Sequence, residues 1–282
     1  MKQRIVFACS GSPDNLAAIP HIAATHDAEI VTLTLDVGQE RGLESVRQAA
    51  IAAGASRAHV LDVREEFARE CILGSFQEGG HEEYPLDQRL ARPLIARKLV
   101  EVALIEAADT IAHAGDSADH EAISSAAHAI DPLIRVVSAS TASSAASANT
   151  VHTTLWGRSI EGASDRPDES ACEQVYSLTA TSRRAPDSPA HLEISFESGL
   201  PVAVNGVPMS LTEFVESVTT IAGNHGVGRV TYASGARSET PAAVVLHAAH
   251  EALGSAALSA PAATVRVELF KGQHRVVSAQ HS

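Results

Sequence analysis

The first half of the chain alternates short apolar runs with stretches in which apolar residues recur at helical spacing. The apolar runs predict buried strands at 5–8, 29–35, 58–61, 110–113 and 133–137. The helical spacing predicts helices at about 16–24, 43–53, 65–73, 90–107 and 119–130. Strands that alternate with helices predict an α/β fold with a doubly wound parallel sheet, which binds ligands at the carboxyl ends of its strands.

The pattern changes after a segment rich in Ser and Ala at 138–150, which we interpret as a linker. Alternation at 192–197 and an apolar run at 201–204, each followed by a turn containing Gly, predict an antiparallel meander. A capping-box pattern at 210–213 begins a helix that the apolar spacing continues to Gly223.

A further helix at 242–253 and a strand at 265–270 complete the second half. The sequence therefore predicts three parts: a first domain at 1–137, the linker at 138–150 and a second, smaller α+β domain at 151–282. A chain of 282 residues is long enough for two such cores.

Composition narrows the class of protein. The formal net charge is −13 and 45% of the residues are hydrophobic, but no apolar run approaches the length of a membrane span. An acidic surface repels phosphate backbones, so we expect neither a nucleic-acid nor a membrane partner. The three cysteines are far apart and form no CxxC pair. We therefore expect a soluble cytoplasmic protein without a signal peptide.

The turn after the first predicted strand is the first candidate for chemistry. Residues 10–15 read Ser-Gly-Ser-Pro-Asp-Asn and separate that strand from a helix. Backbone N–H groups that converge at a helix N-terminus form a cradle for phosphate, and Gly11 permits a close approach. A purely structural turn remains an alternative, in which Ser10 is a turn residue and Asp14 caps the helix.

Nine segments in the same order resemble the argininosuccinate synthase family. The segments are Ala8-Cys9-Ser10-Gly11-Ser12-Pro13-Asp14-Asn15, Leu33-Thr34-Leu35-Asp36-Val37-Gly38-Gln39, Gly54-Ala55-Ser56 with Asp62-Val63-Arg64-Glu65-Glu66-Phe67, Tyr84-Pro85-Leu86 with Leu90-Ala91-Arg92-Pro93-Leu94-Ile95-Ala96, Leu155-Trp156-Gly157-Arg158-Ser159-Ile160-Glu161-Gly162, Val202-Ala203-Val204-Asn205-Gly206, His225-Gly226-Val227-Gly228-Arg229, Glu239-Thr240-Pro241 and Leu269-Phe270-Lys271-Gly272. The resemblance implies an N-type ATP pyrophosphatase fold, similar to the adenine nucleotide alpha hydrolases, with a nucleotide-binding first domain and a synthetase-like second domain.

The resemblance also implies an activity in arginine biosynthesis. The expected enzyme is an ATP-dependent ligase that joins a ureido substrate such as citrulline to an amino acid such as aspartate. The reaction would pass through an adenylylated intermediate and release AMP and pyrophosphate, with ATP and Mg²⁺ as cofactors. Positioning and charge neutralisation would supply most of the rate.

The resemblance carries over to individual positions of this sequence. The residues expected to bind ATP are Ala8, Ser10, Gly11, Asp14, Asn15, Leu35 and Gly115. The residues expected to bind the two substrates are Tyr84, Arg89, Asp119, His120, Ser159 and Glu161. Arg89 and His120 belong to this set as new polar contacts of a rebuilt site rather than as matches to the family pattern.

The sequence departs from the family where the chemistry would occur. Ser12 replaces the second Gly of the loop, and Asn15-Leu16 replaces its final Thr-Ser pair. The segment 113–120 is two residues shorter than the family's loop and lacks its Lys and Asn. Losing several charge-assisted contacts, each worth roughly 1.5–3 kcal/mol, would abolish the original complex unless other contacts replace them. Either the site takes other substrates, or the protein is a degenerate paralogue that binds a nucleotide or another protein.

Metal ligation and assembly receive little support from the sequence. His247 and His250 lie three residues apart on a predicted helix, but no acidic or Cys third ligand accompanies them, so we name no residue as a metal ligand. This sequence is shorter than the family's usual length, and we expect it to assemble without the family's C-terminal oligomerisation arm. A homo-oligomer remains one alternative for its state in solution.

Overall fold

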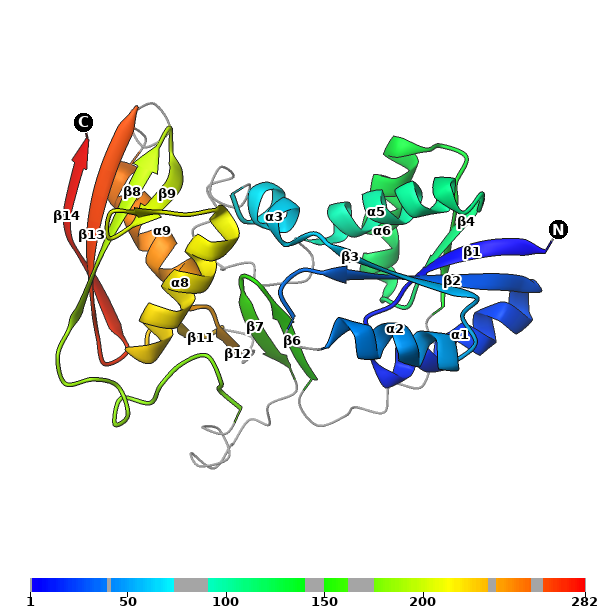
Figure 1. Cartoon of the computed structure of the whole chain (residues 1–282), viewed down its shortest axis with the longest axis horizontal. Helices are drawn as coiled ribbons and strands as arrows, with labels where there is room; N and C mark the ends of the chain where they lie inside the picture. Colours follow the sequence, from blue (N-terminus) through cyan, green and yellow to red (C-terminus); the bar gives the residue numbers. More distant parts are fainter. Residues whose placement is uncertain are drawn as a thin grey trace. The chain divides into compact units, whose positions relative to one another are not determined.

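The computed structural model describes residues 2–39, 42–73, 91–139, 150–161, 175–232, 237–254 and 261–281. The chain forms two compact units (Figure 1). The first contains the described residues of Met1–Val63 and Gln88–Ala145, and the second those of Arg64–Asp87 and Ala146–Ser282. Two differences from the expected domains follow. The described residues 64–73 belong with the second unit, and that unit is the larger of the two in sequence.

The first unit contains the predicted doubly wound parallel sheet, with its strands in the order β3-β2-β1-β4-β5. The strands are β1 (Gln3–Ala8), β2 (Ala28–Asp36), β3 (Arg57–Asp62), β4 (Thr110–His113) and β5 (Arg135–Ser138), and every neighbouring pair is parallel. The chain moves outward from β1 to β3 and then resumes on the other side of β1. The strand order therefore reverses between β1 and β4, which is where sheets of this kind bind ligands.

Helices cover both faces of this sheet (Figure 1). The helices are α1 (Pro13–His26), α2 (Leu43–Ala52), α5 (Arg92–Ile105) and α6 (Ser117–Ile130). On one face, Ile19 and Ile22 of α1 pack with Ile5 and Phe7 of β1. On the other face, Leu99 of α5 and Ile123 of α6 belong to the same core cluster as Val6 of β1 and Val31 of β2. The near-continuous apolar strands are explained by this burial on both sides.

The second unit contains two antiparallel sheets and two long helices. The larger sheet has the order β10-β9-β8-β13-β14, and the smaller has the order β11-β12-β7-β6. The strands are β6 (Thr150–Thr154), β7 (Gly157–Glu161), β8 (Ala190–Glu197), β9 (Leu200–Val204), β10 (Val207–Pro208), β11 (Arg229–Thr231), β12 (Arg237–Glu239), β13 (Ala262–Phe270) and β14 (Gln273–His281). The helices α8 (Leu211–Asn224) and α9 (Pro241–Leu253) pack against each other and against the larger sheet.

A short helical segment after β3 packs in the second unit. It comprises α3 (Arg64–Phe67) and a π-helical turn, η1 (Ala68–Ile72), and both contact α8. The Oε2 atom of Glu65 accepts hydrogen bonds from the Thr212 hydroxyl at 2.8 Å and the Thr212 N–H at 3.3 Å. Because Thr212 lies in the first turn of α8, these contacts satisfy donors at a helix N-terminus. This binding explains why the segment leaves the first unit.

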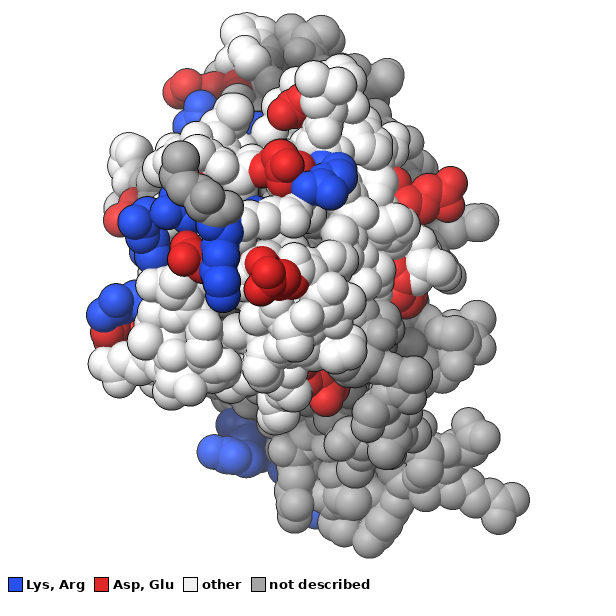
Figure 2. Space-filling model, turned by 90° about the vertical axis from the view of Figure 1, so that its right-hand side faces the viewer, with Lys and Arg blue, Asp and Glu red and all other residues white. Residues whose placement is uncertain are grey.

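Charged side chains of both signs lie close together on the face of the molecule shown in Figure 2. Among the described residues, no helix is both long and apolar enough to span a membrane.

Candidate functional site

The loop between β1 and α1 is closed by its own polar groups. The Oδ1 atom of Asn15 accepts hydrogen bonds from the Ser10 N–H at 2.8 Å and the Ser10 hydroxyl at 3.1 Å. Ser12 is the N-cap of α1 and accepts from the Asn15 N–H at 3.3 Å. A phosphate bound here must therefore displace the Asn15 amide oxygen from Ser10.

Gly11 is required by packing as well as by backbone conformation. Its φ is +76°, in the region that favours glycine. A Cβ atom at this position would lie 2.7 Å from both methyl carbons of Val46 on α2. The preceding Cys9 is also buried, and burial raises the pKa of its thiol although the Gly11 N–H, which donates to the sulfur, acts in the opposite direction. The sulfur is thus held as a thiol inside the loop.

The other ATP-binding candidates of this region have distinct positions. Asp14 lies in the first turn of α1 and is exposed, and the cap of the helix is Ser12 rather than Asp14. Ala8 and Leu35, near the carboxyl ends of β1 and β2, are partly buried against the core. The side chain of Gln39 folds back onto its own turn. Its Nε2 atom donates to the Leu35 carbonyl at 2.6 Å, and its Oε1 atom accepts from the Val37 N–H at 2.8 Å. The segment after β2 is therefore a self-closed turn.

The loop between β4 and α6 faces the same sheet edge as the loop after β1, because β1 and β4 are parallel neighbours. Asp116 and Asp119 form a capping box at the start of α6. Asp119 also forms an ion pair with Arg92 of α5. A Cβ atom at Gly115 would overlap Asp119, so glycine is needed for this close approach. The Asp119 carboxylate, which was expected to bind a substrate, is thus already bound by Arg92 and by the Asp116 N–H.

A pair of histidines lies beside this capping box. His113 ends β4 and is 2% exposed, and its Nε2 atom lies 3.0 Å from the Nδ1 atom of His120 on α6. The rings stack with centroids 5.2 Å apart. Burial lowers the pKa of His113, and the neighbouring His120 lowers it further, although Asp119 and Asp116 oppose both effects. The sequence had suggested His120 but not its partner, because a buried strand-end histidine gives no pattern of its own.

In the second unit, Ser159 lies on a polar face of the smaller sheet. It is opposite His152 of β6 and Ser238 of β12, and residues directly opposite each other share a face. Ser238 is fully buried, and its hydroxyl lies 3.2 Å from the Tyr232 hydroxyl. Glu161 ends the same strand, and its side chain is outside the described residues. Sequence reasoning had linked Ser159 to substrate but had not found this row of hydroxyls.

A buried carboxylate organises the other face of that sheet. Glu239 is fully buried and pairs with Arg158 at 2.7 Å. It also accepts hydrogen bonds from the backbone N–H groups of Ser177, Leu178 and Thr179 and from the Thr179 hydroxyl, at 2.7–2.9 Å. Every one of these contacts is internal to the unit, so Glu239 has a structural role.

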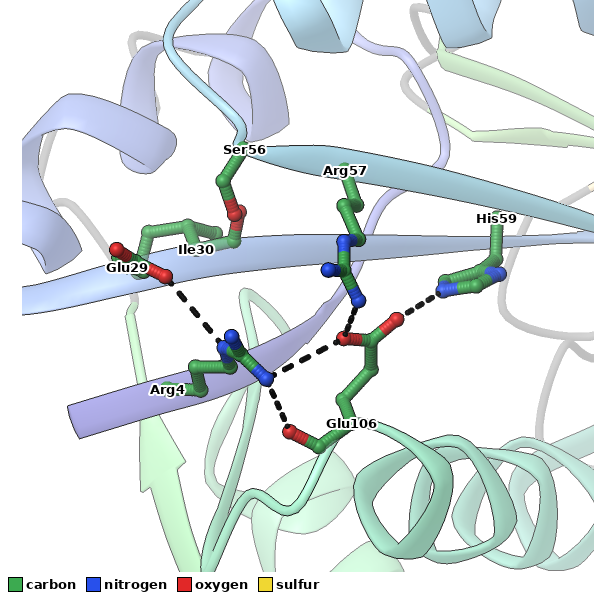
Figure 3. A network of polar contacts seen from close by, with 7 residues as sticks. All are labelled: Arg4, Glu29, Ile30, Ser56, Arg57, His59 and Glu106. Carbon is green, nitrogen blue, oxygen red and sulfur yellow. Dashed lines mark hydrogen bonds and ion pairs between the residues drawn. The ribbon is translucent and has the colours of Figure 1, made fainter. Parts of the chain in front are cut away.

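The network in Figure 3 lies at the opposite edge of the first sheet from the candidate site. Glu106 follows α5 and is 2% exposed, and its carboxylate contacts Arg57 at 2.6 Å and His59 at 2.8 Å. Burial raises the pKa of Glu106, but the hydrogen bonds from His59 and Arg57 and their charges outweigh it, so the pKa lies below its usual value. Because ligands bind at the carboxyl ends of parallel strands, this network stabilises the fold rather than a substrate.

Two candidate residues cannot be placed. Tyr84 and Arg89 lie outside the described residues. In the described part of the chain, no group of three or more His, Cys, Asp or Glu side chains has an arrangement that could hold a metal ion. Mg²⁺ usually binds through one or two carboxylates together with substrate phosphates, so a bound nucleotide would supply the remaining ligands.

Comparisons with known proteins agree with this architecture. The profile described as the arginosuccinate synthase N-terminal HUP domain matches residues 4–150, and that of the C-terminal domain matches residues 150–263. Argininosuccinate synthase of Streptococcus suis is 35% identical, over 89% of this chain and 71% of its own length. The enzyme of Dehalococcoides mccartyi is 34% identical over 92% and 72%, and that of Listeria monocytogenes is 36% identical over 89% and 70%. The chain therefore belongs to the argininosuccinate synthase family, and it is an enzyme of the ligase class.

Proposed function

We propose that the protein is an ATP-dependent ligase that joins a ureido substrate to an amino acid. Citrulline and aspartate are the substrate pair that family membership favours. The single observation that supports nucleotide binding is the arrangement at the switch between β1 and β4. There, the N-termini of two long helices, α1 and α6, follow strands that end at the same sheet edge.

The proposed reaction has two steps. The ureido oxygen attacks the α-phosphorus of ATP, the bond to the bridging oxygen breaks, and pyrophosphate leaves with that electron pair. The amine of the second substrate then attacks the activated carbon and displaces AMP, losing a proton to form the new C–N bond. The protein's part is to hold the phosphates and to align the two substrates.

In this proposal the β1–α1 loop binds pyrophosphate through Ser10 and the backbone groups of the turn. The Ser10 N–H and hydroxyl are the two donors that the Asn15 amide now occupies. A phosphate oxygen would take the place of the Asn15 Oδ1 atom, so the loop needs only a local side-chain rotation. The groups of Ser159 and Glu161 belong to the second unit and would bind the ureido amino acid.

A second candidate function is nucleotide or protein binding without turnover. Two observations favour it: the loop donors are satisfied internally, and Asp119 is paired with Arg92 instead of being available to a substrate. This alternative predicts ligand binding without formation of AMP.

The two functions are separated by product analysis. The full chain is incubated with ATP, Mg²⁺, citrulline and aspartate, and then with other ureido compounds and amino acids, while AMP and pyrophosphate are quantified. The ligase proposal expects both products in equal amounts, only when both substrates are present. Binding of ATP by calorimetry without AMP formation for any pair would instead support the second function, and absence of ATP binding would contradict nucleotide binding altogether.

A matched pair of variants tests the loop. Ser10→Ala removes one hydroxyl donor, which should weaken ATP or pyrophosphate binding about tenfold if the contact is charge-assisted. Ser56→Ala is the control, because the Ser56 hydroxyl donates to the Ile30 carbonyl just before β3, at the opposite sheet edge. Equal affinities for the two variants would contradict a role for Ser10.

A further inference from the structure

The contacts of His113 determine which of its nitrogens carries a proton. The Gly115 N–H donates to the Nδ1 atom of His113 at 3.1 Å, so Nδ1 is an acceptor and bears no hydrogen. A neutral imidazole has one N–H group, and here it must be Nε2–H. The Nε2 atom lies 3.0 Å from the Nδ1 atom of His120, so His113 donates and His120 accepts.

The same logic continues to the second ring. Because the Nδ1 atom of His120 accepts a hydrogen bond, it bears no proton, and the proton of neutral His120 resides on Nε2. Protonating either ring would place two N–H groups face to face, at the His113–His120 contact or at the contact with Gly115. When both imidazoles are neutral, the chain Gly115–His113–His120 thus leaves one N–H, on Nε2 of His120, for another partner.

The position of His120 suits ligand binding. His120 lies in the first turns of α6, at the carboxyl edge of the sheet, and it is partly exposed while His113 is buried. The charged groups around the pair are Asp116 and Asp119 on α6 and Arg92 on α5, which pairs with Asp119. On the adjacent strand β4, the titratable group that contacts His120 is His113.

We propose that His113 is a positioning residue that holds His120 as an Nε2–H donor for an uncharged carbonyl oxygen of a ureido or carboxamide group. The inference rests on the proposed function, because it concerns the substrate edge of the same sheet. It also names a ligand class. Hydrogen bonds in which the donor or the acceptor is charged are about twice as strong as neutral ones, so a cationic donor would favour an anion. An Nε2–H group with the carboxylates of Asp116 and Asp119 at the same end of the helix suits an uncharged acceptor, because these carboxylates repel an anion.

Nitrogen NMR of the histidines in the full chain tests the tautomers directly. Protein labelled with ¹⁵N-histidine is recorded between pH 6 and pH 8, and the His120 signals are assigned by their loss in His120→Gln. For the neutral form of each ring, we expect Nδ1 to be unprotonated and Nε2 to carry the hydrogen. An Nδ1–H tautomer of either neutral ring would overturn the proposal.

Titration with small molecules tests the ligand class in the same samples. Citrulline and asparagine supply ureido and carboxamide oxygens, whereas aspartate and inorganic pyrophosphate supply anionic ones. We expect the His120 Nε2–H signal to shift with citrulline, with asparagine or with both, and to stay in place with the two anions. A shift with the anions alone, or with none of the four compounds, would show that His120 does not recognise a carbonyl group.

Variants separate the roles of the two rings. His113→Phe keeps a ring of similar size without nitrogen, so the His120 Nδ1 atom loses its donor and both tautomers of the neutral His120 ring should appear. His120→Gln keeps an N–H donor and should retain citrulline affinity within about threefold, whereas His120→Phe should lose about tenfold, as expected for one hydrogen bond. If His113→Phe does not fold, His113→Asn provides the same test. Equal affinities of the two His120 variants would overturn the proposal.

These results are distinguishable from failure of the proposed function. If His120 responds to citrulline but no AMP forms, the ligase reaction is wrong and the carbonyl site stands. If AMP and pyrophosphate form while His120 is insensitive to every compound, the ligase proposal stands and this inference alone fails.

Discussion

Single residues of the candidate site have structural as well as chemical reasons for their identity. A Cβ atom at Gly11 would clash with Val46, and one at Gly115 would clash with Asp119. The Asn15 amide oxygen accepts the hydrogen bond of the Ser10 N–H. A glycine in a phosphate loop is usually explained by the approach of the ligand. Here, packing between the loop and α2 already requires it.

Replacing Gly11 with alanine should therefore destabilise the first unit. The residue combines a φ of +76° with a Cβ clash, so we expect a loss of about 2–4 kcal/mol in the free energy of unfolding, measured with urea. Gly206→Ala is the matched control: its φ is +75° and nothing lies within 4 Å of its Cβ, so it should lose about 1 kcal/mol. Val46→Ala should recover part of the loss in the Gly11→Ala protein, and equal losses for the two glycine variants would contradict the clash.

Glu106 makes stability depend on pH in the acid range. Its native pKa lies below the ordinary value of 4.5, so its stabilisation is complete above that value and is lost as the pH falls through the native pKa. Glu106→Gln should lose about 1–3 kcal/mol at pH 7 and should show a flatter decline below pH 4.5. Glu29→Gln is the control, because the exposed Glu29–Arg4 pair at 3.4 Å is worth about 0.5 kcal/mol or less. Parallel pH profiles of Glu106→Gln and the unmodified protein would contradict this role.

Sequence reasoning reached some of these residues and missed others. The loop serine and glycine follow a recognisable strand–turn–helix pattern, so their location could be predicted. The His113–His120 contact could not be predicted, because it depends on the distance between the end of a strand and the first turns of the helix that follows. Hydrogen bonds within the loop were also hidden, since the sequence does not show which side chains turn inward.

At the scale of elements, buried carboxylates join strands to loops. Glu239 connects β12 to Arg158 of β7 and to the backbone of Ser177–Thr179. Arg229 of β11 extends the connection, because it donates to the Thr179 hydroxyl at 2.8 Å. Three strands of the smaller sheet therefore depend on one carboxylate.

Glu239→Gln should destabilise the second unit strongly. Both carboxylate oxygens accept from several donors, so an amide NH₂ group would face N–H groups and leave Arg158 without its charge partner. We expect a loss of about 3–5 kcal/mol in the free energy of unfolding. The control Glu193→Gln removes an exposed pair with Arg266 and should lose about 0.5 kcal/mol. A small loss for Glu239→Gln would show that the network contributes little.

The strands and helices of the first unit could be predicted because apolar runs alternate with helical spacing along this part of the sequence. Helix α8 was also predicted correctly, because its capping box and apolar spacing are local features. In the second unit, the strands β6, β7, β10, β11, β12 and β14 were missed. Strand β14 is mostly exposed, and the short strands of the smaller sheet are held by partners distant in sequence, so their residues carry little apolar alternation.

At the scale of the whole molecule, the chain passes from one unit to the other at Val63. Segments on the two sides of Val63 should therefore open with different free energies although they are neighbours in sequence. Residues 57–62 belong to the first unit, whereas 64–73 belong with α8 in the second. Local opening follows such cooperative units rather than proximity in sequence. Hydrogen exchange of the full chain, followed by mass spectrometry, measures the opening of both segments in one experiment.

A destabilising change in one unit should therefore affect only one of these neighbouring segments. Glu239→Gln should accelerate exchange in 64–73 and in α8 while leaving 57–62 protected, because Glu65 binds Thr212 of the weakened unit. Gly11→Ala should have the opposite effect, since β3 pairs with β2 beside the altered loop. Glu193→Gln and Gly206→Ala show how much exchange changes with mild destabilisation. If 57–62 and 64–73 respond together to both strong variants, the chain opens as a single unit and the boundary at Val63 has no energetic meaning.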